Sequence, residues 1–118
     1  MCNILFLPKG ISIIESSITN MVLNNPDGLG LLVQGDDGKV VEAVRQFDPA
    51  GTKPTVVINL LKKHKDKNRL LHVRFNTHGE SSLLNVHPFP VYTSKTRNVF
   101  MMHNGTMHDY KPPSTVDA

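Results

Sequence analysis

Residues 29–45 read LGLLVQ-GDDG-KVVEAVR, and this stretch predicts the class of fold. Two short apolar-rich runs, Leu29–Gln34 and Lys39–Arg45, flank four turn-forming residues. Strand-like runs joined by a short glycine-containing turn are typical of a β-hairpin. Because a hairpin joins antiparallel strands, the stretch indicates an antiparallel sheet.

Helical and strand-like patterns are mixed along the rest of the chain. Apolar residues at spacings of three and four predict an amphipathic helix over residues 11–23. A second helix is expected to start near Pro54, with Thr52 as a nearby cap. Its buried face is expected to comprise Val56, Val57, Leu60, Leu61 and His64.

Further strands are expected in the apolar run that ends at Leu7 and at residues 70–75 and 98–102. The segment 83–91 contains two prolines, which indicates an edge strand or a loop. Strands that come in neighbouring pairs between helices favour an α+β fold with layered antiparallel sheets.

Composition limits the class of protein. The 118 residues suit one domain, and 39% apolar with 19% charged residues is ordinary for a globular protein. No apolar run reaches the length of about eighteen residues that a membrane span needs. The net charge of +3 is too small to indicate a nucleic acid or a membrane surface as partner. The basic run at residues 62–69 is expected to be a solvated helix end.

The only cysteine excludes an internal disulfide and fits a reducing compartment. Because the first ten residues have neither the charged segment nor the cleavage site of a signal peptide, a cytoplasmic location is expected.

Cys2 is the first candidate for chemistry. A small second residue usually permits removal of the initiator methionine, which would make Cys2 the first residue. Its α-amino group, with an ordinary pKa of about 7.7–8.0, could then take the thiol proton directly or through a water. The alternative is that Cys2 is a small apolar residue buried at the start of a strand.

The motif His103-Asn104-Gly105 follows an apolar strand. An asparagine amide and the backbone N–H of a glycine are suitable donors to the oxyanion of an acyl-transfer reaction. The alternative is that Asn-Gly is only a hairpin turn.

Arg74 lies within an otherwise apolar strand. If its side chain points inward, the guanidinium can bind a carboxylate through two hydrogen bonds, and Thr77 and Gly79 could add a hydroxyl and backbone groups. The alternative is a strand residue on the solvent face.

Other chemistry finds little support. The spacings His103/His108 and His72/His78 match no known pair of metal ligands, and one cysteine does not favour a structural zinc site. Gly28-Leu29-Gly30 lacks the third glycine and the helix of a dinucleotide-binding motif.

Five blocks occur together in one order along about 105 residues. They are Met1-Cys2, Asn25-Pro26-Asp27-Gly28-Leu29-Gly30, Arg74-Phe75-Asn76-Thr77-His78-Gly79, Asn85-Val86-His87-Pro88-Phe89 and His103-Asn104-Gly105. In this series the chain resembles the class II glutamine amidotransferases, whose glutaminase domains use an N-terminal nucleophile.

The resemblance implies an α+β fold of the αββα type, with two antiparallel sheets between helix layers. It implies that the Cys2 thiolate attacks the side-chain amide of glutamine, releasing ammonia and leaving a glutamyl thioester that is hydrolysed to glutamate. Asn104 and Gly105 would form the oxyanion hole. Arg74 would hold the substrate α-carboxylate, and Thr77, Gly79 and His103 would line the same pocket. The block at residues 25–30 would shape the site, and His87 would pack rather than react.

The chain departs from the family pattern in two ways. Relatives carry an acidic residue well after the His-Asn-Gly motif that pairs with the substrate α-amino group, and neither Asp109 nor Asp117 has that context. Relatives' domains are also longer. We therefore expect residues 1–118 to form a single glutaminase-type domain that is incomplete at its C-terminus and pairs with a partner or belongs to a longer protein.

The expected ligand is glutamine, with an ammonia-accepting domain or partner protein and without cofactor, metal, nucleic acid or membrane. The alternative function is a catalytically impaired relative that acts as a protein-binding or regulatory module.

Overall fold

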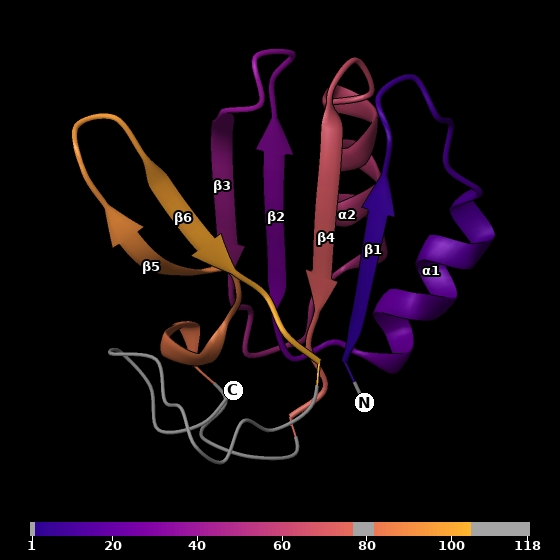
Figure 1. Ribbon diagram of the computed structural model, residues 1–118. Coiled ribbons are helices and arrows are strands. Elements are labelled where there is room, and N and C mark those ends of the chain that lie inside the picture. Colours follow the sequence, from indigo (N-terminus) through magenta and orange to yellow (C-terminus); the bar gives the residue numbers. More distant parts are fainter. Residues whose placement is uncertain (1, 77–81, 105–118) are drawn as a thin grey trace.

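A computed structural model describes residues 2–76 and 82–104 of the chain. Its larger sheet has four strands, and each neighbouring pair is antiparallel. In spatial order (Figure 1) they are β1 (Asn3–Leu7), β4 (Asn68–Val73), β2 (Leu29–Gln34) and β3 (Val40–Gln46).

The predicted hairpin is confirmed as β2 and β3. Leu31 pairs with Val44, and the turn closes with a hydrogen bond of 2.8 Å from the Gly35 N–H to the Lys39 carbonyl. Gly38 has a φ of 82°, a conformation that a residue without Cβ adopts at little cost.

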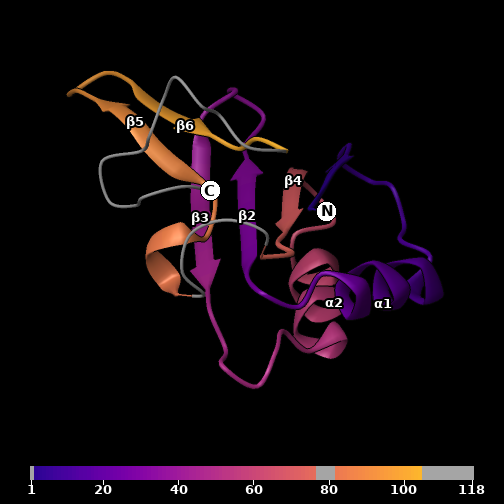
Figure 2. The same cartoon turned by 90° about the horizontal axis from the view of Figure 1, so that it is seen from below.

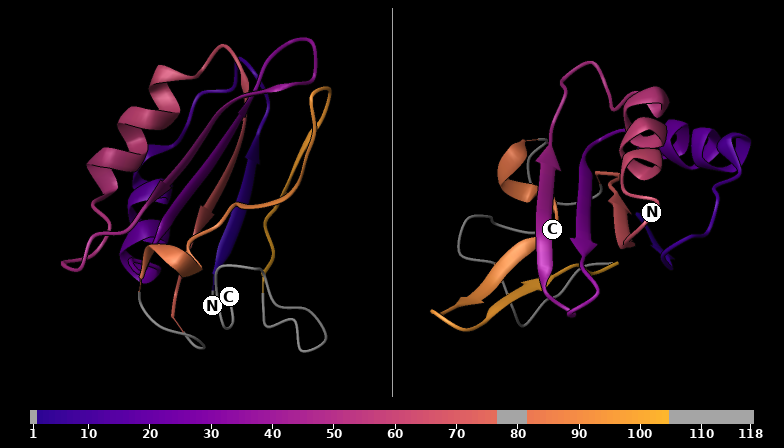
Figure 3. Two further views of the ribbon diagram at one scale, coloured as in Figure 1. Left: turned by 90° about the vertical axis from the view of Figure 1, so that its left-hand side faces the viewer. Right: turned by 90° about the horizontal axis from the view of Figure 1, so that it is seen from above.

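Two helices cover one face of this sheet (Figures 2 and 3): α1 (Glu15–Asn24) and α2 (Pro54–Lys63). Side chains alternate across a strand, so every second residue of β2 faces the helices. In the cluster between the helices and this sheet, the residues that are less than 2% exposed are Val22 of α1, Val57 and Leu61 of α2, and Leu29, Leu31, Val33, Leu71 and Val73 of the sheet.

The first helix begins later than the sequence predicts. Ile11 and Ile14 are 49% and 69% exposed and precede α1, so the expected helix over 11–23 is wrong in its first turn. The Ile11 N–H instead donates to the Pro8 carbonyl, and the Gly10 N–H donates to the Lys65 carbonyl at 2.7 Å. These bonds hold the chain in a turn before the helix can start.

The second helix begins at Pro54 as expected, but Lys53 takes the capping position without a side-chain hydrogen bond, so Thr52 is not the cap. The buried face of α2 is also rotated from the expected one. Ile58 is buried, whereas Val56 is 38% exposed.

Arg69 departs from the expectation of a solvated basic run. It is 1% exposed, and its guanidinium donates to the carbonyls of Leu61, Pro8 and Ile11 at 2.8–3.1 Å. Three carbonyl acceptors offset the cost of burying the charge and tie the end of α2 to the segment after β1.

The second sheet is a hairpin on the face opposite the helices (Figure 3). A single 3₁₀ turn, η1 (Leu83–Asn85), leads into β5 (Phe89–Thr93), which pairs with β6 (Asn98–Met101). The mixed α+β class is therefore confirmed. Among the residues that the structure describes, helices cover one sheet only, so the complete αββα sandwich remains a prediction.

Candidate active site

Cys2 lies where the start of β1 meets the end of β4. Asn3 pairs with Val73, which brings Cys2 beside Phe75. The Phe75 N–H donates to the Cys2 Sγ at 3.4 Å, and the thiol donates to the Phe75 carbonyl at 3.6 Å. Cys2 is half-buried, so its sulfur is held against the backbone without being enclosed in the apolar core.

Arg74 lies immediately before Phe75 and is 1% exposed, so the alternative of a solvent-facing arginine is wrong. Burial lowers the pKa of Arg74, and the nearby Cys2 and Asp27 act in the opposite direction by favouring its charged form. The guanidinium donates to the Asn76 Oδ1 at 3.0 Å. A buried cation therefore lies within electrostatic reach of Cys2, and its role in binding a carboxylate stays a prediction.

The turn between α1 and β2 is fastened to the same end of β4. The Asp27 N–H donates to the Arg74 carbonyl at 2.8 Å, and the Arg74 N–H donates to the Gly28 carbonyl at 2.9 Å. The Asp27 Oδ2 accepts the Asn76 N–H at 2.7 Å. Sequence reasoning assigned this block a shaping role only and did not single out Asp27.

The rings of three histidines form one row, called the stack here: His72 is stacked on His87, and His103 packs against His87 at a tilt of 39°. The ring centroids of His72 and His87 are 3.9 Å apart, and those of His87 and His103 are 4.6 Å apart. The backbone N–H of His103 donates to the His87 Nδ1 at 3.2 Å. Because His72 lies on β4 two residues before Arg74, which directly follows that strand, the stack joins the chain after β6 to the strand that leads into Arg74.

Two of these histidines, His72 and His87, are buried and neutral. His72 and His87 are at most 1% exposed, and burial lowers their pKa values to about 4 and about 2. The expected packing role of His87 agrees with these contacts. Sequence reasoning missed the stack, because its members are 15 and 16 residues apart and show no spacing pattern.

Two glycines allow the segment at residues 85–89 to approach the first sheet. A Cβ on Gly30 would overlap the His87 carbonyl oxygen, and one on Gly28 would lie 2.8 Å from a Val86 methyl. Arg45 adds hydrogen bonds from its guanidinium to the carbonyls of Val86 at 2.7 Å and Leu83 at 2.6 Å. The chain is thus held by Arg45 on the N-terminal side of the stacked His87.

The predicted site residues are only partly placed. Cys2 bonds to Phe75, the residue after Arg74, and His103 packs against His87, which is stacked on His72 of β4. Asn104 is exposed and directly follows His103. Thr77, Gly79 and Gly105 lie outside the described residues.

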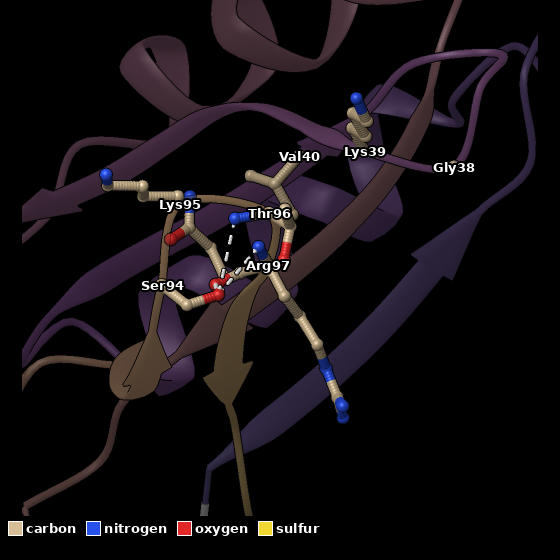
Figure 4. Close-up of a pocket in the computed structure, with 8 residues that line it drawn as sticks. Gly38, Lys39, Val40, Ser94, Lys95, Thr96 and Arg97 are labelled. Atoms are coloured by element: carbon tan, nitrogen blue, oxygen red, sulfur yellow. Dashed lines mark hydrogen bonds between the residues drawn. The ribbon is translucent and has the colours of Figure 1, made fainter.

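A separate hollow of about 490 Å³ lies between the β2–β3 turn and the β5–β6 turn (Figure 4). Its lining includes Lys39, Lys95 and Arg97, whose charged groups point in different directions. The Ser94 hydroxyl accepts hydrogen bonds from backbone N–H groups of the same turn. None of the predicted site residues that the structure describes lines this hollow, which lies at the other end of the sheet from Cys2 (Figure 1).

Within residues 2–76 and 82–104, no group of three or more histidine, cysteine or acidic residues is arranged to hold a metal ion. In the same part of the chain, no helix has the length and apolarity to cross a membrane.

Comparison with known proteins gives the family. The family model described as "Glutamine amidotransferases class-II" matches residues 16–117. The chain therefore belongs to the class II glutamine amidotransferases. Neither the curated proteins nor the solved structures contain a match.

Proposed function

We propose that this chain hydrolyses the side-chain amide of glutamine with Cys2 as nucleophile and delivers ammonia to an acceptor. The observation that carries the proposal is the position of the half-buried Cys2 sulfur, hydrogen-bonded to Phe75 beside the buried Arg74 guanidinium. A nucleophile next to a carboxylate-binding cation suits an amino acid substrate.

The first half of the proposed reaction forms a thioester. Removal of Met1 frees the Cys2 amine, which takes the thiol proton while the sulfur attacks the glutamine Cδ. The carbonyl oxygen becomes an oxyanion, for which we propose the Asn104 amide and the Gly105 N–H as donors. Collapse of the intermediate breaks the C–N bond, and the proton held by the Cys2 amine goes to the leaving NH₂ group, which departs as ammonia.

The second half restores the enzyme. The Cys2 amine takes a proton from water, the resulting hydroxide attacks the thioester, and the C–S bond breaks. The sulfur leaves as a thiolate and regains a proton, and glutamate is released. Arg74 holds the α-carboxylate through both half-reactions, and Thr77, Gly79 and His103 line the rest of the proposed pocket.

We propose that the ammonia acceptor belongs to another domain or to a partner protein, as the family membership suggests. A cysteine nucleophile must stay reduced, which supports a cytoplasmic location for the reaction.

The test combines mass with activity. The intact mass is expected to show loss of Met1, and the protein is expected to release glutamate and ammonia from glutamine in equal amounts. An electrophilic glutamine analogue, 6-diazo-5-oxonorleucine, is expected to add one covalent label to the wild type and none to Cys2→Ala. Cys2→Ala is expected to reduce ammonia release to background, because no other described group replaces the sulfur.

Arg74→Lys provides the second arm. Lysine keeps the charge but loses the paired donors of the guanidinium, so KM for glutamine is expected to rise more than kcat falls. Lys95→Ala, at the far turn, is the matched control and is expected to match the wild type. Ammonia release that persists unchanged in Cys2→Ala would exclude the proposed nucleophile.

A further inference from the structure

Four turns lie at the end of the sheets that is away from Cys2 (Figure 1). Together they form a surface, called the basic turn surface, that comprises residues 8–10, 35–39, 64–67 and 94–97. These turns carry six basic and three acidic residues, so their excess of positive charge equals that of the whole chain. We propose that the basic turn surface binds an acidic polypeptide segment, in which several Asp or Glu side chains follow one another along an extended chain.

Contacts between the turns make the surface continuous. The Lys9 Nζ lies 2.9 Å from the Asp36 Oδ1, which joins the first turn to the second. The Gly10 N–H donates to the Lys65 carbonyl at 2.7 Å, which joins the first turn to the third. The hollow of about 490 Å³ lies between the second turn and the fourth (Figure 4). A ligand lying along this end of the sheets could therefore contact all four turns.

Two of the three acidic residues are already paired within the surface. Asp36 accepts a hydrogen bond from the Lys9 ammonium, which lowers the pKa of the Asp36 carboxyl. Asp66 lies 3.7 Å from the Lys67 Nζ. The basic residues of the surface that form no ion pair with a described residue are Lys39, Lys65, Lys95 and Arg97. These four cations are available to an anionic partner.

The directions of the cations at the hollow decide the kind of ligand. Lys39, Lys95 and Arg97 are exposed, and their charged groups point in different directions (Figure 4). Among the described residues, none that lines the hollow is acidic. In this arrangement a single phosphate or carboxylate cannot contact all three cations. An extended peptide can, because its successive residues are about 3.3 Å apart and each can carry a carboxylate.

A nucleic acid is the competing ligand for a basic surface. Proteins that bind single strands combine basic residues with aromatic side chains on which the bases stack. The four turns contain no Phe, Tyr or Trp. Tyr92 on β5 is exposed, but the Arg97 guanidinium lies over its ring, 5.9 Å from the centroid. The three carboxylates among the cations also disfavour closely spaced phosphates. These features favour an acidic polypeptide.

Fluorescence anisotropy with a labelled decaglutamate peptide tests the proposal. The wild type is expected to bind the peptide at about 50 mM salt and to lose affinity as salt is raised, because exposed charges are screened. Lys39→Gln with Lys95→Gln is expected to weaken binding about fivefold, since each exposed ion pair is worth a factor of about two to three.

Lys53→Gln with Lys63→Gln is the matched control. It removes the same charge from exposed lysines at the two ends of α2 and is expected to bind within about twofold of the wild type. Cys2→Ala is expected to bind decaglutamate as the wild type does. The proposal is therefore tested independently of the proposed function.

Equal weakening in the two double variants would overturn the proposal, because the peptide would then respond to net charge and not to the hollow. Tighter binding of a labelled decathymidylate than of decaglutamate would assign the surface to nucleic acid instead. Absence of decaglutamate binding by the wild type at about 50 mM salt would also overturn it. If the Lys39/Lys95 variant loses its folded circular dichroism spectrum, Lys95→Gln alone is expected to weaken binding about twofold.

Discussion

Replacing Gly30 with alanine tests the close approach of the segment at residues 85–89 to β2. The added Cβ would overlap the His87 carbonyl oxygen and lie 2.6 Å from its carbonyl carbon. Ordinary contacts begin at 3.4 Å, so the backbone at His87 must withdraw by roughly 0.8 Å or more. The obstacle is main chain, which has no rotamer to change.

The expected loss of unfolding free energy has two sources, the overpacking at His87 and the weakened hydrogen bonds from Arg45. Overpacking of a rigid site costs about 1–3 kcal/mol. The Arg45 guanidinium also bonds to the neighbouring Val86 and Leu83 carbonyls, and weakening these charge-assisted bonds adds about 1.5 kcal/mol or more. Gly30→Ala is therefore expected to lose about 3 kcal/mol or more, a large share of the stability of a small domain.

Urea unfolding followed by circular dichroism measures this loss, with two other glycines as graded comparisons. At Gly35 the nearest atom to a new Cβ is a Val41 methyl at 3.2 Å, so Gly35→Ala is expected to cost less than about 1 kcal/mol. At Gly28 a Val86 methyl lies at 2.8 Å, and Gly28→Ala is expected to fall between the two. A Gly30→Ala protein as stable as Gly35→Ala would refute the described approach of His87 to β2.

Two further predictions concern the same region. Stability is expected to fall as pH drops below about 6.5, because His72 and His87 stay neutral in the fold, where their pKa values are about 4 and about 2, but gain protons in the unfolded chain. Down to its own folded pKa, each histidine contributes about 1.4 kcal/mol per pH unit to the slope of the unfolding free energy against pH. His87→Phe removes one group that binds a proton on unfolding, so it is expected to lower this slope between pH 6 and 4.5 by about that amount. An unchanged slope would contradict this assignment. Arg45→Met is expected to lower the free energy of unfolding by about 2 kcal/mol and to lower hydrogen-exchange protection at residues 85–89, since two carbonyls lose a charged donor. Arg97→Met at the exposed turn is the control. Equal protection in both variants would count against the role of Arg45.

Local patterns in the sequence were enough to predict the hairpin of β2 and β3. Two short apolar-rich runs around a glycine-containing turn at residues 35–38 predict an antiparallel pair from neighbouring residues alone. The start of α2 at Pro54 was predicted for the same reason, because proline is favoured in the first turn of a helix. The ordered blocks also identified the family, which the family model confirms.

The environments of the charged residues could not be predicted in this way. Arg69 belongs to a basic run in the sequence, yet it is buried, because the carbonyls of Leu61, Pro8 and Ile11 converge on it from separate elements. The start of α1 was also misplaced. The apolar spacing continues through Ile11 and Ile14, but the turn after β1 prevents those residues from joining the helix.

The sequence by itself therefore determined the types of the main elements and the family, because backbone periodicity and turn chemistry depend on neighbouring residues. Only the tertiary structure decided which side chains meet. Asp27 and Arg74 are 47 positions apart, and they lie side by side because strand β4 ends where the turn after α1 crosses it. Such contacts depend on the register of the strands and on which face of the sheet is covered, and neither property is contained in a local pattern.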